Sequence, residues 1–163
     1  MKIVKVDIVF FSRTGNTRMV AKTILQALEQ SSDVKLIEIK AKTNYPYFIW
    51  LLLSFLPNFG VKIMCNDVTV TSDLVFICFP KWTINCPPVT AFLRQVDLTE
   101  KKVYLVITYG GFDEERYAEA YKEKIKKLCK EVKGVLLVKR SEIKKGDLSE
   151  TKGWIERVLK EKI

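Results

Sequence analysis

A short polar turn between an apolar segment and an amphipathic segment carries the strongest chemical signal in the chain. Its six residues are Ser12, Arg13, Thr14, Gly15, Asn16 and Thr17. A helix that begins here presents unpaired N–H groups and the positive end of its dipole, and Gly15 gives the turn backbone conformations that other residues disfavour. Three hydroxyl groups and one amide add side-chain donors. The turn therefore predicts an anion site that suits a phosphate.

The motif also narrows the kind of phosphate. The turn lacks the Gly-Lys-Ser/Thr ending of a Walker loop, and it is not a GxGxxG fingerprint. These absences favour the monophosphate of a mononucleotide over a triphosphate or a pyrophosphate. The alternative is an ordinary polar connection that leads into a capped helix. The phosphate interpretation gains weight because residues 8–11 are entirely apolar, as in a strand of an open parallel sheet.

The composition excludes several kinds of catalysis. The chain has no histidine, so it has no histidine general base, Ser-His-Asp triad or Cys-His pair. None of its four cysteines belongs to a CxxC pair, which argues against zinc and disulfides and favours a reducing cytoplasm. We therefore predict no catalytic side chain and no metal site, and we expect the chemistry to come from a cofactor.

The elements that must position the turn alternate between strands and helices. Apolar runs predict five strands, at about residues 2–11, 34–39, 74–79, 103–108 and 135–139. Helical spacing predicts helices at about residues 16–30, from 87 onward, at 114–132 and near 154–159. The alternation predicts a single α/β domain over residues 1–163, a doubly wound parallel sheet in the order 2-1-3-4-5 with helices on both faces.

Two further loops are expected to meet the polar turn where the winding direction of such a sheet reverses. They contribute Pro80, Lys81, Trp82, Thr83, Ile84 and Asn85 after the third strand, and Thr108, Tyr109, Gly110, Gly111 and Phe112 after the fourth. Trp82 suits a stacking wall for a flat ligand, and Tyr109 or Phe112 suits a second wall. The alternatives are that Trp82 only covers the adjacent helix and that the two glycines only form a turn.

Together these residues resemble the flavodoxin family. Residues 9–17, followed by Ala21 and Ile24, are similar to that family's amino-terminal signature for the phosphate of flavin mononucleotide (FMN). The flavin-ring loops of the family are similar to residues 80–82, 87–88 and 108–111. The resemblance covers nearly all of the chain except about residues 44–66, an apolar segment that looks like an insert.

The resemblance implies FMN as the cofactor and a flavodoxin-like protein that carries electrons on the flavin. It implies that Ser12, Thr14, Gly15, Asn16 and Thr17 hold the phosphate, with added charge from Arg13 and Arg18. It also implies that residues 80–86 and 108–112 contact the isoalloxazine ring and the ribityl chain. One alternative is an enzyme that uses NAD(P)H and FMN to reduce a quinone or a flavin. The other is a flavodoxin-like binding module without flavin.

The charge of the chain departs from that of typical flavodoxins, which are strongly acidic. The formal net charge here is +9. We therefore expect a redox partner protein with an acidic docking face. No RNA-binding signature accompanies the lysines, so nucleic acid is not an expected partner.

The apolar run at residues 45–57 is the second departure. It is too short and too bounded by prolines for a membrane span. The favoured interpretation is a short helix packed on the domain. The alternative is an exposed patch for a dimer, a partner or a membrane surface, and the sequence leaves the oligomeric state open.

The basic surface generates the first prediction. If charge steers the redox partner to this protein, their association weakens as the salt concentration rises, because mobile ions screen exposed charges. The affinity measured by calorimetry between about 0.05 M and about 0.5 M salt tests this. An affinity that does not change with salt contradicts steering by charge.

Overall fold

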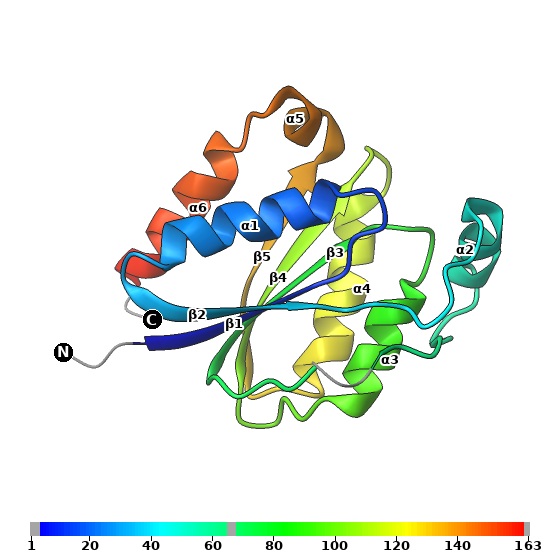
Figure 1. Cartoon of the computed structure of the whole chain (residues 1–163), viewed down its shortest axis with the longest axis horizontal. Coiled ribbons are helices and arrows are strands. Elements are labelled where there is room, and N and C mark those ends of the chain that lie inside the picture. Colours follow the sequence, from blue (N-terminus) through cyan, green and yellow to red (C-terminus); the bar gives the residue numbers. More distant parts are fainter. Residues whose placement is uncertain (1–3, 65–67, 162–163) are drawn as a thin grey trace.

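A five-stranded parallel sheet forms the centre of the molecule (Figure 1). The computed structural model describes residues 4–64 and 68–161. The sheet has the order β2-β1-β3-β4-β5, which confirms the predicted topology. Its strands are β1 (Val4–Phe10), β2 (Ser32–Glu38), β3 (Leu74–Pro80), β4 (Lys102–Tyr109) and β5 (Glu131–Lys139).

Helices cover both faces of the sheet, as the sequence predicts. They are α1 (Asn16–Leu28), α2 (Tyr47–Ser54), α3 (Pro87–Gln95), α4 (Glu114–Lys126), α5 (Arg140–Lys145) and α6 (Ser149–Lys160). Apolar residues of α1, α5 and α6 pack in one core, and apolar residues of α3 and α4 pack in the other. Figure 1 shows the same division, with α1 and α6 on one side of the sheet and α3 and α4 on the other.

The strand β3 supplies both cores from a single apolar run. Successive side chains of a strand point to opposite faces. Val75, Ile77 and Phe79 lie in the core with α3 and α4, whereas Phe76 and Cys78 lie in the core with α1 and α6. All seven residues of β3 are buried, as expected for a central strand of a doubly covered parallel sheet.

The boundary between α4 and β5 differs from the prediction. A helix through residue 132 was expected, but α4 ends at Lys126 and β5 already begins at Glu131. The N–H groups of Leu128 and Cys129 both donate to the carbonyl of Ile125 and close the helix there. Residue Val132 pairs with Val103 of β4 instead. Val132, whose apolar spacing suggests a longer helix, belongs to the strand β5, where successive side chains point to opposite faces of the sheet.

The apolar run at residues 45–57 does form a short helix, α2, but only part of it is packed. Trp50 and Ser54 are its buried residues. Most of its other apolar side chains are exposed. In Figure 1 this helix stands at the outer end of the molecule, beyond the layers that cover the sheet. Within the described residues, no helix combines the length and the apolar character that crossing a membrane requires.

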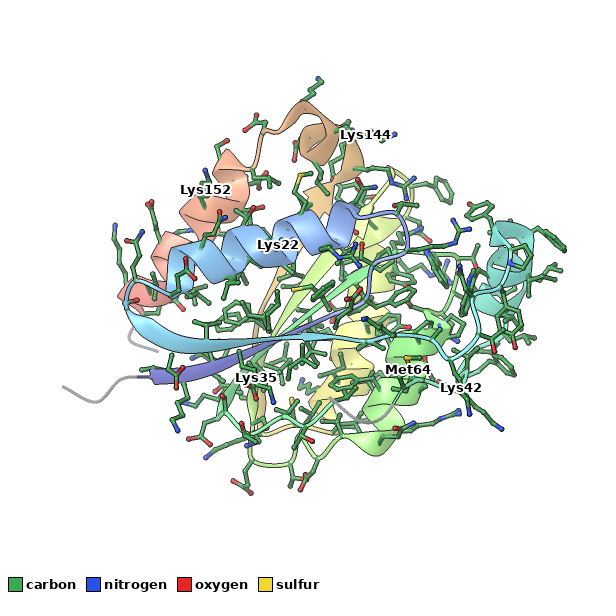
Figure 2. The ribbon with its side chains drawn as sticks, viewed as in Figure 1. Lys22, Lys35, Lys42, Met64, Lys144 and Lys152 are labelled. Carbon is green, nitrogen blue, oxygen red and sulfur yellow. The ribbon has the colours of Figure 1, made fainter. Side chains whose placement is uncertain are left out.

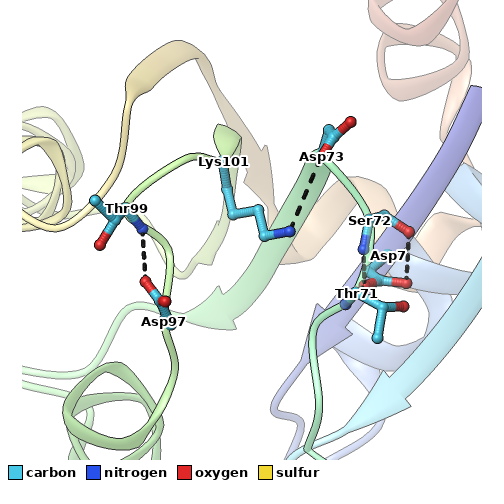
Figure 3. Close-up of polar contacts among 7 residues, drawn as sticks. All are labelled: Asp7, Thr71, Ser72, Asp73, Asp97, Thr99 and Lys101. Atoms are coloured by element: carbon cyan, nitrogen blue, oxygen red, sulfur yellow. Dashed lines mark hydrogen bonds and ion pairs between the residues drawn. The ribbon is translucent and has the colours of Figure 1, made fainter.

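A buried carboxylate fastens the segment before β3 to the neighbouring strand β1 (Figure 3). Asp7, in the middle of β1, is only 1% exposed. Its Oδ2 accepts hydrogen bonds from the backbone N–H groups of Thr71 (2.7 Å) and Ser72 (2.9 Å). Its Oδ1 accepts one from the Ser72 hydroxyl at 3.0 Å. Both oxygens of this buried carboxylate therefore accept hydrogen bonds, as a buried polar group requires.

These contacts predict that Asp7→Asn destabilises the protein. The amide has the same shape, and its oxygen can still accept the two backbone N–H groups. Its NH2 group then replaces the oxygen that accepts the Ser72 hydroxyl, so this buried O–H loses its acceptor. We expect the free energy of unfolding to fall by about 2–3 kcal/mol in a urea titration. Asp97→Asn is the matched control, because Asp97 also accepts a backbone N–H, from Thr99 at 3.0 Å, but is exposed (Figure 3). Equal stability changes in the two variants would contradict this role of Asp7.

Candidate functional site

One pocket lies over the carboxyl ends of β1, β3 and β4, where the winding of the sheet reverses. Its volume is about 440 Å³, within the usual range for small-molecule sites. Its walls are formed by the turn before α1, the two loops after β3 and β4, the helix α2 and the first residue of α5. The lining residues are Ser12, Arg13, Thr14, Asn16, Thr17, Tyr47, Trp50, Leu51, Pro80, Lys81, Trp82, Thr83, Thr108, Gly110, Gly111, Phe112 and Arg140.

The polar turn has the local geometry that the sequence predicts. Gly15 has φ 94°, in the left-handed region that favours glycine, and it is the residue from which α1 begins. Its N–H group donates to Oγ of Ser12 at 3.1 Å, and Nδ2 of Asn16 donates to Oγ1 of Thr14 at 3.3 Å. The turn therefore orders its own side chains. No side chain caps the N-terminus of α1, which leaves the first N–H groups of the helix available to an anion.

A buried pair of hydroxyl groups connects the turn to the end of β4. The Oγ1 atoms of Thr17 and Thr108 lie 2.8 Å apart and are hydrogen-bonded. The carbonyl of Thr108 accepts the N–H of Lys81 at 2.7 Å, which joins the loop after β3 to the same point. The three loops are therefore fixed relative to one another at the floor of the pocket.

Aromatic rings form one wall of the pocket. The Trp82 ring makes an edge-to-face contact with Phe11, with a centroid separation of 5.5 Å, and its centroid lies 5.5 Å from that of Trp50. Trp50 in turn contacts Tyr45 at 5.2 Å. Trp82 is half-buried and lines the pocket. It therefore packs on its neighbours and still faces the pocket, and its contact with a flat ligand stays a prediction.

The helix α2 is bound to the loop after β3 through Ser54. The carbonyl of Ser54 accepts the N–H groups of Ile84 (3.1 Å) and Asn85 (2.9 Å). Its hydroxyl lies 2.6 Å from that of Thr83. Because both segments line the pocket, these bonds hold two of its walls together.

Asn85 supports the same loop from behind. The side chain is 1% exposed. Its Nδ2 donates to the carbonyls of Leu56 (3.1 Å) and Phe59 (2.7 Å), and its Oδ1 accepts the hydroxyl of Tyr121 at 3.1 Å. The Tyr121 oxygen also accepts the N–H of Cys86 at 2.7 Å. The side-chain amide of Asn85 is therefore bonded to other parts of the protein through both its nitrogen and its oxygen.

The charges at the pocket are positive. Arg13, Lys81 and Arg140 line it, and none of its lining residues is Asp or Glu. The Arg13 guanidinium lies over the Tyr47 ring, 5.2 Å from its centroid, and the Lys81 ammonium lies 5.6 Å from the Tyr117 ring centroid. Arg18, a further source of charge suggested by the sequence, forms an ion pair with Glu38 instead. The field in the pocket therefore favours an anionic ligand.

The cysteine beside the pocket is not prepared for reaction. Cys86 is fully buried, and burial raises the pKa of its thiol well above the usual range. A thiol in that environment stays protonated at neutral pH and is a poor nucleophile. Burial likewise raises the pKa of Tyr121 well above its usual value, so this network contains no ready base.

The structure brings most of the predicted site residues to this one pocket. Of the residues named for the turn and the two loops, four lie outside its lining: Gly15, Ile84, Asn85 and Tyr109. Arg18 and Cys86, which the resemblance adds, also lie outside it. Gly15 shapes the turn, Asn85 is buried, and Ile84 is exposed with its N–H held by Ser54. Contacts of all the predicted residues with FMN, including these four, remain predictions from the sequence.

Four lining residues are not among those that the sequence suggests. Three of them, Tyr47, Trp50 and Leu51, belong to α2, and the fourth is Arg140 at the start of α5. The aromatic and apolar composition of residues 45–57 was a visible signal, but nothing in it indicates that this segment folds over the pocket. Arg140 directly follows β5, and its guanidinium lies beside Gly110. Because ligands of such sheets bind beyond the carboxyl ends of the strands, this place in the sequence was a signal for Arg140.

The comparisons with known proteins identify one relative and a fold. No protein-family model matches the chain. An uncharacterized protein of Archaeoglobus fulgidus is 45% identical over 138 residues, which cover 85% of this chain and 88% of that protein. A likeness of this extent places both chains in one family.

Solved structures with the same fold are flavodoxins and flavoproteins by description. A candidate flavoprotein from Bacteroides uniformis superimposes with a TM-score of 0.74 at 20% identity, over 95% of this chain and 99% of its own. Oxidised flavodoxin 2 from Bacillus cereus gives 0.64 at 16% identity, over 97% and 99%. An NADH:FMN oxidoreductase in its apo form gives 0.63 at 16% identity, over 94% and 87%. The chain thus belongs to one family with the Archaeoglobus fulgidus protein, and its fold is that of the flavodoxins.

Proposed function

We propose that the pocket binds FMN and that the protein carries electrons on the bound flavin. The observation that carries this proposal is the composition of a single pocket. A helix N-terminus with ordered hydroxyl groups and a wall of aromatic rings open into the same space. A ligand that suits both is a flat aromatic system joined to a monophosphate.

The donors of the pocket fit FMN at the phosphate. Ser12 and Thr14 carry hydroxyl groups, Asn16 carries an amide, and Arg13 carries a positive charge, all beside the first turn of α1. Hydrogen bonds from such groups to a charged phosphate are stronger than those between neutral groups. These residues would hold the phosphate, and they would do so without burying an unpaired charge.

The other lining residues fit the ring system. Trp82 and Phe112 supply aromatic surface, and Gly110 and Gly111 leave the backbone of the β4 loop open to close approach. Bound FMN would supply one- and two-electron redox chemistry, which this set of side chains cannot supply. The residues of this chain would bind the flavin, orient it and exclude water from one side of it.

An electron carrier is favoured over an enzyme because the pocket lining offers no carboxylate, thiol or imidazole for proton transfer. Its lining residues include no Asp, Glu or Cys, and the chain has no His. The net charge of +9 supports a redox partner with an acidic docking face. Cys78, Cys86 and Cys129 are free thiols, which supports a reducing compartment such as the cytoplasm.

The second candidate is an FMN-dependent oxidoreductase that takes hydride from NAD(P)H. Two observations favour it. One structure with this fold is an NADH:FMN oxidoreductase by description. The pocket lining also has two exposed arginines, Arg13 and Arg140, which is one cation more than a single phosphate needs. The oxidation of NADH and NADPH, followed at steady state with the FMN-loaded protein and a soluble quinone, distinguishes the two. For a carrier we expect no turnover above that of free FMN.

The phosphate assignment predicts a selective loss of affinity in Thr14→Ala. This variant removes one hydroxyl donor at the turn, so we expect FMN to bind about tenfold more weakly. Riboflavin, which has the same ring but no phosphate, should bind as it does to the unaltered protein. Quenching of flavin fluorescence measures both affinities.

Thr23→Ala is the matched control, because Thr23 lies on α1 outside the pocket lining and its hydroxyl donates to the carbonyl of Met19. We expect this variant to bind FMN normally. Failure of the unaltered protein to bind FMN or to gain visible absorbance would overturn both redox functions. It would leave a flavodoxin-like module that binds another ligand.

A further inference from the structure

The helix α2 and the turn after it expose an unusual number of large apolar side chains. Phe48 is 60% exposed and Leu52 is 61% exposed. The full set of exposed apolar side chains in this segment is Tyr47, Phe48, Leu51, Leu52, Phe55, Leu56 and Phe59, which we call the α2 face. Soluble monomers rarely expose apolar side chains together in such numbers without a binding role.

The α2 face is held in place although it is exposed. Trp50 and Ser54 fasten the helix to the body through ring contacts with Trp82 and hydrogen bonds to residues 83–85. Asn85 fixes the turn that follows by donating to the carbonyls of Leu56 and Phe59. The exposed side chains are therefore presented on a rigid support and do not reach the core.

Positive charge surrounds the α2 face. Residues 39–64 contain Lys40, Lys42 and Lys62 and no Asp or Glu. The backbone of Lys42 bonds to that of Lys62 at 2.8 Å, so these two exposed lysines lie side by side where the segment leaves and rejoins the body. Two arginines from outside the segment also touch it: Arg13 lies over the Tyr47 ring, and Arg94 donates to the carbonyl of Asn58.

Little of this charge is neutralised within the described residues. Lys40 lies 3.9 Å from Glu38, which is also the partner of Arg18. The ion pairs of the described residues include none for Lys42 or Lys62. Figure 2 shows Lys42 and Met64 at the end of the molecule that carries α2, and Lys22 and Lys152 on α1 and α6 at the other side.

From this arrangement we propose that the α2 face docks on an anionic lipid membrane. Apolar and aromatic side chains on an interfacial helix enter the boundary between headgroups and acyl chains, and neighbouring cations attract anionic headgroups. The helix is far too short to span the bilayer, so the protein lies on its surface. Tyr47 and Leu51 belong to both the α2 face and the pocket lining, so the pocket borders the surface that would contact the membrane.

The charges argue against a second copy of the chain as the occupant. In a twofold dimer the same patch meets itself. The lysines at residues 40, 42 and 62 of both chains would then approach one another without a carboxylate in either segment, and like charges in contact disfavour association. An anionic surface gains from the same charges.

Co-sedimentation of the full chain with vesicles tests the proposal, which goes beyond the proposed function and does not depend on it. We expect binding to phosphatidylcholine vesicles that contain about 30% phosphatidylglycerol and much weaker binding to phosphatidylcholine alone, with a decrease at high salt. Absence of binding to the anionic vesicles overturns the proposal.

Two matched pairs of variants locate the surface. F48S/L52S should lower the partition coefficient at least tenfold, whereas Leu128→Ser, which removes an exposed apolar side chain (40% exposed) from the turn between α4 and β5, should not. K42Q/K62Q should weaken binding to anionic vesicles, whereas K22Q/K152Q, with the same net charge, should weaken it less. Equal effects within either pair contradict this location of the surface.

Two further measurements separate the alternatives. Light scattering reports the mass of the unaltered protein, and a dimer that F48S/L52S dissociates would assign the α2 face to a second copy and overturn the membrane proposal. Neither Phe48 nor Leu52 lines the pocket, so the F48S/L52S variant should bind FMN like the unaltered protein. If the unaltered protein binds the anionic vesicles but does not bind FMN, the proposed function alone is overturned.

Discussion

The structure depends on one constraint: the strand β3 is buried on both of its faces. A parallel strand in that position must be apolar throughout, and helices must cover it from both sides. The chain meets this requirement by sending α1 and α6 to one face and α3 and α4 to the other. The direction of winding therefore reverses between β1 and β3, and the loops that leave these strands diverge. The pocket is the space that this divergence leaves over the ends of the strands.

The precision of the pocket comes from polar contacts beneath and behind it. The hydroxyl groups of Thr17 and Thr108 bond to each other and join the start of α1 to the end of β4. The carbonyl of Thr108 accepts a backbone N–H group from the loop after β3. Behind that loop, the side-chain nitrogen of Asn85 donates to two backbone carbonyls, and its oxygen accepts the Tyr121 hydroxyl. A buried amide that is bonded at both ends fixes the backbone around it.

The pocket and the helix α2 share positive charge. Arg13, Lys81 and Arg140 converge on it without a carboxylate among its lining residues, and the chain as a whole has a net charge of +9. The same arginine that lines the pocket also lies over Tyr47 of α2. The ligand site and the apolar helix therefore share walls and charges, and anything that covers α2 changes the surroundings of the pocket.

Much of this was readable from the chain itself. The sheet order follows from alternating apolar runs, and Gly15 at φ 94° follows from the turn motif, because local sequence governs both strand burial and turn geometry. The end of α4 could not be read, since its apolar spacing continues into β5 and only pairing with β4 decides between helix and strand. The sequence does not predict the position of α2 either, because its apolar residues suit both a packed helix and an exposed one. Hydrogen bonds from Ser54 to residues distant in sequence decide which side chains are buried. The local pattern of the chain therefore predicts the fold and the geometry of the turn before α1. Tertiary contacts alone bring α2 to the pocket, because contacts between residues far apart in the sequence leave no local pattern.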